Sequence, residues 1–175
     1  MTNNDACVSC STCLPHAVIK AGSTTILDSA FEHCSSLISV SIPDSVTSIG
    51  EWSFSECASL SSVIIPDSVT SIGSNAFSLC SSLSSVTIGN GVTTIGNLAF
   101  AECHSLQNVS FGHNMTSIGS NAFSSCSSLT SVIIPDSVTA IGYYAFSFCT
   151  SLSSVVIPDS ITTIGDGSDT IRNNN

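Results

Sequence analysis

The chain has 175 residues and a formal net charge of −10, and Lys20 and Arg172 are its only lysine and arginine. Charged residues make up 8% of the sequence, against about 25% in ordinary globular proteins. Two cations are too few to neutralise the phosphates of a nucleic acid or an anionic lipid surface. We therefore expect neither as a partner.

Residues 1–30 are predicted to form a degenerate N-terminal capping coil. Leu14, Ile19 and Ile26 lie one 23-residue period before apolar positions of the repeats that follow. Elsewhere the pattern slips, as is typical of a terminal unit, with Lys20 where several repeats have proline. Residues 1–20 also contain neither the basic start nor the apolar run of a signal peptide. No apolar run reaches the length of about 18 residues that would predict membrane insertion.

A short cysteine motif lies inside this first segment, at Cys7, Cys10, Cys13 and His16. These residue types are ligands of structural zinc, which makes the motif a weak metal candidate. Structural zinc usually joins two separated ligand pairs, so a local disulfide in an oxidising compartment and ordinary thiols are competing interpretations. We therefore predict no bound metal and no cofactor.

Residues 31–165 are predicted to form six repeats of 23 residues, because several residue types recur at this spacing without insertion or deletion. A unit of this size cannot bury its own apolar side. Stacking is expected to place each apolar side chain on its copy in the next coil. The clearest series are Phe31, Phe54, Phe77, Phe100, Phe123 and Phe146, and Cys34, Cys57, Cys80, Cys103, Cys126 and Cys149.

Each repeat consists of three short pieces. The first, such as residues 83–88, alternates apolar residues with Ser and Thr and predicts a strand. A proline ends this strand in most repeats, and Asp-Ser then forms a turn. The second piece, residues 69–72, is β-branched and extended. The third, residues 74–80, predicts a single helical turn capped by Ser74. The expected fold is a mostly β repeat solenoid with a parallel sheet, short second strands and single helical turns.

The string IPDSVTSIGSNAFSLCSSLSSVTI at residues 65–88 resembles the BspA-like subfamily of leucine-rich repeats. That subfamily shares the 23-residue period, the Leu-x-x-Val-x-Ile-Pro strand and the Thr-Ser-Ile-Gly-x-x-Ala-Phe segment, over about residues 31–165. The resemblance implies a protein of bacterial or protist cell surfaces, and so an extracellular or cell-surface location. Several members are adhesins that bind host or matrix proteins. It carries no catalytic residues to this chain.

The resemblance also implies that ligands bind the exposed side of the first strands. We therefore expect a protein ligand, of unknown identity, at twelve outward positions: Ser39, Ser41, Ser62, Ile64, Ser85, Thr87, Asn108, Ser110, Ser131, Ile133, Ser154 and Val156. The repeat containing Gly112, His113 and Asn114 departs most from the common pattern. Asn108 and Asn114 each begin a glycosylation sequon, which matters only in a chain secreted by a eukaryote.

The cysteine series predicts six free, buried thiols. Cysteine is among the most buried residue types, and one copy per coil beside the Phe core indicates a small apolar side chain filling a fixed position. Cysteines in one slot of adjacent coils would lie within disulfide range, but their parallel side chains rarely reach the required torsion.

Two further columns of polar residues have structural and functional interpretations. Asp44, Asp67, Asp136 and Asp159 share one turn position and could bind Ca²⁺, but side chains that bond turn amides are the simpler interpretation. Paired Thr and Ser residues on the second strands, such as Thr47-Ser48 and Thr70-Ser71, resemble the arrays of ice-binding faces. Only one residue of each pair can point outward.

The function predicted from the sequence is a non-catalytic protein-binding or adhesive scaffold. The four histidines are scattered and no nucleophile or phosphate-binding motif is present, so an enzyme is not expected. Residues 166–175 form a polar tail without an obvious closing helix. An unfinished final coil would expose strand edges, so self-assembly end to end into a fibre or oligomer is the alternative function. Ice binding is a more distant one.

Overall fold

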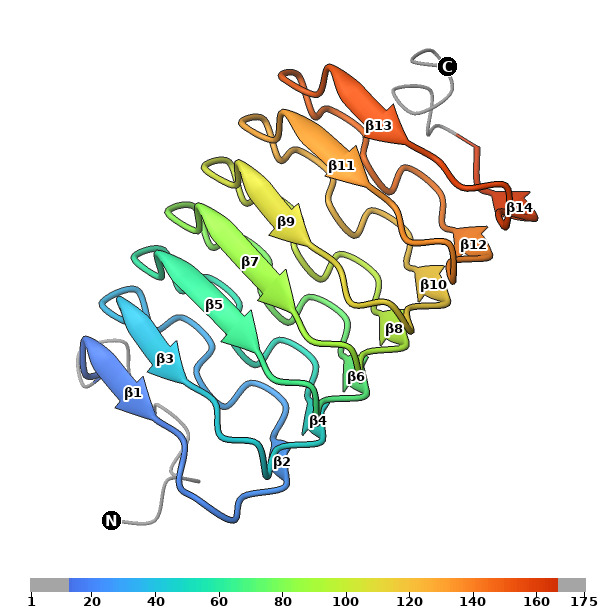
Figure 1. Cartoon of the computed structure of the whole chain (residues 1–175). Coiled ribbons are helices and arrows are strands. Elements are labelled where there is room, and N and C mark those ends of the chain that lie inside the picture. Colours follow the sequence, from blue (N-terminus) through green and yellow to red (C-terminus); the bar gives the residue numbers. More distant parts are fainter. Residues whose placement is uncertain (1–12, 167–175) are drawn as a thin grey trace.

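The computed structural model describes residues 13–166, which wind as a solenoid of stacked coils with parallel strands (Figure 1). Within this range the structure contains strands and turns and no helix, hence no helix that could cross a membrane. The first strand of each coil belongs to one series: β1 (His16–Val18), β3 (Ser39–Ser41), β5 (Ser62–Ile65), β7 (Ser85–Ile88), β9 (Asn108–Ser110), β11 (Ser131–Ile133) and β13 (Ser154–Val156).

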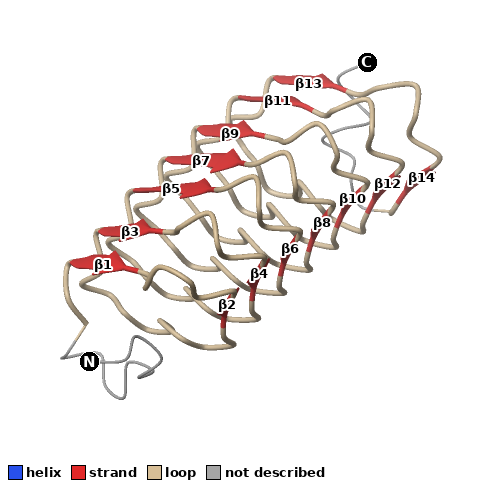
Figure 2. Cartoon of the chain, turned by 60° about the horizontal axis from the view of Figure 1, so that its bottom comes forward, coloured by secondary structure: helices blue, strands red, loops and turns tan. Residues whose placement is uncertain are grey.

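The second strands form another series, on a different side of the solenoid (Figure 2). They are β2 (Thr25–Ile26), β4 (Ser48–Ile49), β6 (Ser71–Ile72), β8 (Thr94–Ile95), β10 (Ser117–Ile118), β12 (Ala140–Ile141) and β14 (Thr163–Ile164). All seven pair in one continuous parallel sheet. The first strands instead form three separate sheets, β1-β3, β5-β7-β9 and β11-β13.

The register confirms the repeat, because paired residues are 23 positions apart, as in Ile49 with Ile72 and Val63 with Val86. Phenylalanine rings stack along the axis with centroids 5.0 Å apart between Phe54 and Phe77, and 5.2 Å apart between Phe77 and Phe100. These rings and the recurring Leu, Val, Ile and Cys side chains are buried in one cluster. The core positions predicted from the period are therefore the core of the fold.

The prediction of a single helical turn after each second strand was wrong. Phe77 donates its backbone N–H to Ala99 of the next coil at 2.7 Å, and Asn75 donates to Asn97 at 2.9 Å. A helix would use these groups within its own turn. In addition, Asn75 and Leu79 have φ values of 57° and 59°, in the left-handed region, and this pattern recurs in each coil. These residues therefore form consecutive turns, held by backbone hydrogen bonds between neighbouring coils, in place of a helix.

Glycine after the second strand is required by close packing of neighbouring coils. A Cβ atom on Gly96 would lie 2.6 Å from the backbone carbon of Gly73, and one on Gly73 would meet Gly50 at the same distance. Backbone atoms cannot give way as a flexible side chain would. This explains why the Ile of each second strand from β4 to β14 is followed by Gly, whereas Ile26 of β2 is followed by Leu27.

In the first described coil, Ile19 and Ile26 are buried as the period predicts, but Leu14 is 72% exposed. Leu14 occupies the position of buried Leu37, which lies one coil further into the stack. Since no earlier coil covers Leu14 within the described residues, the terminal coil does not bury it.

Candidate functional site

The first-strand face is formed by the outward side chains of the seven first strands. The strand register aligns them in two rows, with Ser39 paired to His16 and Ser41 to Val18 at one end. All twelve positions predicted from the sequence lie in these rows. Ten of them are exposed, and Ser39 and Ser85 are half-buried. His16 and Val18 extend the face and were missed, although each lies one period before a predicted position.

Exposed aliphatic side chains interrupt the hydroxyl-rich rows at four points. The exposed fractions are 69% for Val18, 71% for Ile64, 70% for Ile133 and 53% for Val156. All four lie in the same row, because Val18 pairs with Ser41, Ile64 with Thr87 and Ile133 with Val156. The first-strand face therefore carries isolated exposed aliphatic side chains on an otherwise neutral, polar surface.

A depression of about 320 Å³ lies on this face between β9 and β11, lined by residues including Asn108, Ile133 and Pro135. No backbone hydrogen bond joins these two strands within the described chain. Phe111, which occupies the position of Ile88, packs edge-on against Phe123 beside this break, with ring centroids 5.7 Å apart. The irregular repeat identified from the sequence therefore adjoins one of the two breaks in the first-strand series, the other being between β3 and β5.

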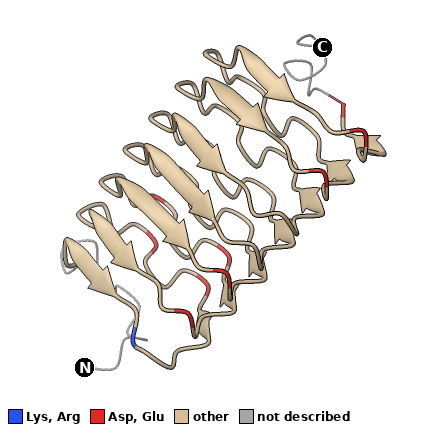
Figure 3. Ribbon diagram, in the orientation of Figure 1, with Lys and Arg blue, Asp and Glu red and all other residues tan. Residues whose placement is uncertain are grey.

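The described acidic residues lie on the turns, and the outward rows of the first-strand face contain no Lys, Arg, Asp or Glu (Figure 3). In the turn column, Asp67 accepts the backbone N–H of Asn90 at 2.6 Å, and Asn90 accepts that of His113 at 3.1 Å. These bonds agree with the structural interpretation of the column. Among residues 13–166, no group of three or more potential ligands could hold a metal ion.

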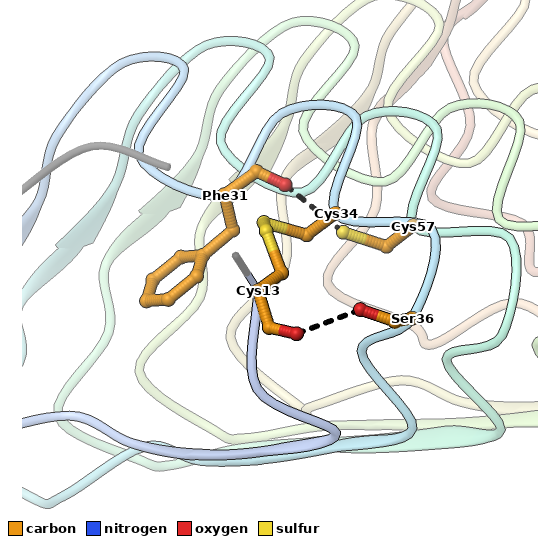
Figure 4. The surroundings of a disulfide bond; sticks show 5 residues. All are labelled: Cys13, Phe31, Cys34, Ser36 and Cys57. Carbon is orange, nitrogen blue, oxygen red and sulfur yellow. Dashed lines mark hydrogen bonds between the residues drawn. A yellow bond between two sulfur atoms is a disulfide. The ribbon is translucent and has the colours of Figure 1, made fainter. Parts of the chain in front are cut away.

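Cys13 and Cys34 form a disulfide, with their Cα atoms 5.5 Å apart (Figure 4). The prediction of six free thiols is therefore wrong for Cys34. That prediction considered cysteines in the same slot of adjacent coils, whereas Cys13 lies 21 residues before Cys34 and approaches it from outside the slot. The disulfide also removes Cys13 as a thiolate ligand, and His16 bonds Ser39 at 2.8 Å. Cys7 and Cys10 lie outside the described residues.

The other five cysteines of the series are free and buried, as predicted: Cys57, Cys80, Cys103, Cys126 and Cys149. Each thiol donates to the backbone carbonyl of a phenylalanine 26 residues earlier, as Cys103 does to Phe77 at 3.2 Å. Burial raises the pKa of Cys57 and Cys103 to about 12. A thiol with so high a pKa is a poor nucleophile and a poor metal ligand at neutral pH.

The threonine column of the second strands is exposed but hydrogen bonded within the solenoid. Thr70 donates its hydroxyl to the carbonyl of Thr47 at 3.1 Å, and Thr93 donates to Thr70 at the same distance. The same bond recurs at Thr116, Thr139 and Thr162. These hydroxyls therefore hold adjacent coils together. Asn108 and Asn114 are exposed, and their glycosylation stays a prediction.

The comparison with known families identifies two segments, residues 3–126 and 71–168, that match the model of the BspA type leucine rich repeat region in 6 copies. No protein with a curated description matches the chain.

Among solved structures, a leucine-rich repeat protein from Bacteroides ovatus is 38% identical, with a TM-score of 0.80; the match covers 86% of this chain and 39% of that one. The leucine-rich repeat protein of T. pallidum is 30% identical, with a TM-score of 0.81, over 86% of this chain and 72% of that one. A leucine rich cell surface protein from Faecalibacterium prausnitzii is 27% identical, with a TM-score of 0.60, over 91% of this chain and 62% of that one.

Proposed function

The chain belongs to the BspA-type leucine-rich repeat family, and on that premise we propose that it is a non-catalytic scaffold that binds a protein ligand at the cell surface or outside the cell. The observation that carries this proposal is the first-strand face, an exposed surface free of Lys, Arg, Asp and Glu along all seven strands. A similar protein from Faecalibacterium prausnitzii is described as a cell surface protein, which supports the location.

The composition of the first-strand face suits protein binding. Ser and Thr side chains lose little conformational entropy when a partner immobilises them. Their hydroxyl groups both donate and accept hydrogen bonds. The exposed methyl groups of Ile64, Ile133 and Val156 supply apolar area that a partner can bury. Adhesion would follow if the partner is fixed to a host surface or matrix.

The described residues offer little for catalysis. The Nδ1 atom of His33 lies 3.0 Å from an Oε atom of Glu56 on an exposed turn. Burial raises the pKa of the Cys57 and Cys103 thiols to about 12, and each of the five buried thiols donates to a backbone carbonyl. Nucleophilic catalysis would need a thiol or hydroxyl within hydrogen-bond reach of a base such as histidine. We therefore propose that the chain is not an enzyme.

The protein-binding proposal is tested with purified extracellular-matrix proteins, each immobilised and exposed to the intact chain. The matched variants are Ile64→Arg with Ile133→Arg on the first-strand face, and Thr94→Arg on the second strands as control. We expect binding to at least one matrix protein, with a loss of roughly tenfold or more in the face variants and little change in the control. Equal losses in both would contradict the proposed face, and no binding to any of them would contradict the proposed ligand class.

End-to-end self-assembly is a second candidate function, supported by the last described coil. Ile157, Ile161 and Ile164 are half-buried there, whereas the equivalent residues one coil earlier, Ile134, Val138 and Ile141, are buried. Light scattering distinguishes this candidate. Growth of the mass with concentration is its expected result, and a constant mass near 17.9 kDa would contradict it.

A further inference from the structure

We propose that a groove on the second-strand side binds a neutral sugar residue. The groove has a volume of about 480 Å³ and lies beside the ends of β10, β12 and β14. This volume is in the range of small-ligand sites, about 300–1,000 Å³. The site is separate from the first-strand face, so the two proposals can succeed or fail independently.

Two departures from the repeat coincide in the coil that forms the floor of this groove. Ala140 interrupts a column that has Thr94, Ser117 and Thr163 at the equivalent positions. Tyr143 lies in a column of small polar residues, such as Asn97 and Ser120. Both Ala140 and Tyr143 line the groove. The small side chain lowers the floor, and the ring, 57% exposed, adds an aromatic wall.

Polar groups surround this aromatic wall. Ser117, Ser120 and Thr163 line the groove, and no hydrogen bond of their hydroxyls is found within residues 13–166. This distinguishes Ser117 and Thr163 from the adjacent Thr116 and Thr162, whose hydroxyls donate to backbone carbonyls.

Asn97 and Asp166 complete the polar lining of the groove. The Oδ1 atom of Asn97 accepts the backbone N–H of Ser120 at 2.8 Å. This bond fixes the orientation of the amide and leaves its NH₂ group as a donor. The groove therefore presents both donors and acceptors around an aromatic ring.

A neutral pyranose matches this combination. Its C–H face is apolar and packs on an aromatic ring, while its hydroxyls exchange hydrogen bonds with hydroxyl, amide and carboxylate groups. Acidic sugars are disfavoured, because the carboxylate residue Asp166 lines the groove. Lys20, the one lysine or arginine among residues 13–166, lies in the first coil at the opposite end of the solenoid (Figure 3). The ligand class is therefore an uncharged sugar or the uncharged residue of a glycan.

The test is a titration of the intact chain with methyl glycosides of glucose, galactose, mannose and N-acetylglucosamine, followed by amide resonances in NMR. Glucuronate serves as the charged comparison. We expect at least one neutral glycoside to shift resonances of residues 117–120, 140–143 and 163–165, saturably and with a Kd in the millimolar range. Glucuronate should bind more weakly.

Two variants restore the residue type of neighbouring coils and should therefore fold. Ala140→Ser refills the floor and Tyr143→Ser removes the aromatic wall, and each is expected to weaken binding by roughly fivefold. Tyr144→Asn is the matched control, because Tyr144 is exposed but does not line the groove, and Asn75 and Asn121 occupy its slot elsewhere. The proposal is overturned by the absence of any saturable shift up to about 50 mM sugar. Equal binding of glucuronate, or an equal loss in the Tyr144→Asn control, would also overturn it.

Discussion

The free cysteines show how one slot of the coil determines the chemistry of a residue. Each thiol is buried beside the phenylalanine stack and donates to a backbone carbonyl of that stack, as Cys57 does to Phe31 at 3.1 Å. Desolvation disfavours the thiolate, which raises the pKa of Cys57 and Cys103 from 9.0 to about 12. Residues that would attract attention as reactive groups are therefore part of the core.

This environment predicts a fall in stability at alkaline pH. The unfolded thiol loses its proton near pH 9, while the folded thiols of Cys57 and Cys103 keep theirs until about pH 12. Between these values the unfolded state binds fewer protons, so the free energy of unfolding decreases as the pH rises. Denaturant titrations from pH 8 to 11 should show this decrease, and it should be shallower in the double variant Cys57→Ala/Cys103→Ala. An unchanged slope in that variant would contradict the assignment.

The phenylalanine stack makes an equally specific prediction. Phe100 is fully buried between Phe77 and Phe123, so Phe100→Ala leaves a cavity and is expected to cost about 3–5 kcal/mol. Trp52→Ala serves as the control, because Trp52 is 42% exposed and should cost much less. The measurement is chemical denaturation of both variants, and similar losses would contradict the central role of the stack.

At the scale of the element, the second-strand sheet depends on close contact between glycine backbones. In Gly96→Ala the new Cβ would lie 2.6 Å from the backbone of Gly73, so the two coils must separate at β6 and β8. We expect a loss of about 1–3 kcal/mol. Ser82→Ala, on an exposed turn, should change stability by less than about 0.5 kcal/mol. A neutral Gly96→Ala would show that the coils adjust freely.

The sequence predicts these elements to different degrees. The 23-residue period identifies the strands and the core, because every apolar position is repeated in register. The period does not reveal the consecutive turns after the second strands. Residues such as Leu79 and Phe148 have φ values of 59° and 57° there, which their residue types disfavour. Hydrogen bonds between coils hold these conformations, and a prediction from local propensity does not include them.

The candidate sites were predictable to a smaller extent. The outward rows of the first strands follow from strand alternation alone. The sugar-binding groove left a signal in the sequence, namely two departures from the repeat within Ala140–Tyr143. Recognising it as a groove required knowing that β10, β12 and β14 lie side by side. The Cys13–Cys34 disulfide likewise depends on where the chain enters the first coil.

For the whole molecule, stability is approximately the sum of contacts between neighbouring coils. A terminal coil contacts only one neighbour, so an additional bond there has a large effect on its local stability. The disulfide ties the first described coil to the second across 21 residues, and a loop of this size is expected to contribute about 3 kcal/mol. In Cys13→Ser the amides of β1 and β2 should exchange hydrogen faster, with little change beyond β6. Exchange can be followed by mass spectrometry. Uniform acceleration along the whole chain would contradict this local role.

Cross-saturation NMR tests most directly whether a protein partner binds the first-strand face, as we propose. Saturation is transferred from a bound matrix protein to methyl groups of this chain that lie against it. We expect intensity losses at the methyl groups of four residues exposed on that face: Val18, Ile64, Ile133 and Val156. Losses confined to the methyls of Thr70, Thr93 and Thr116, on the second-strand side, would contradict it.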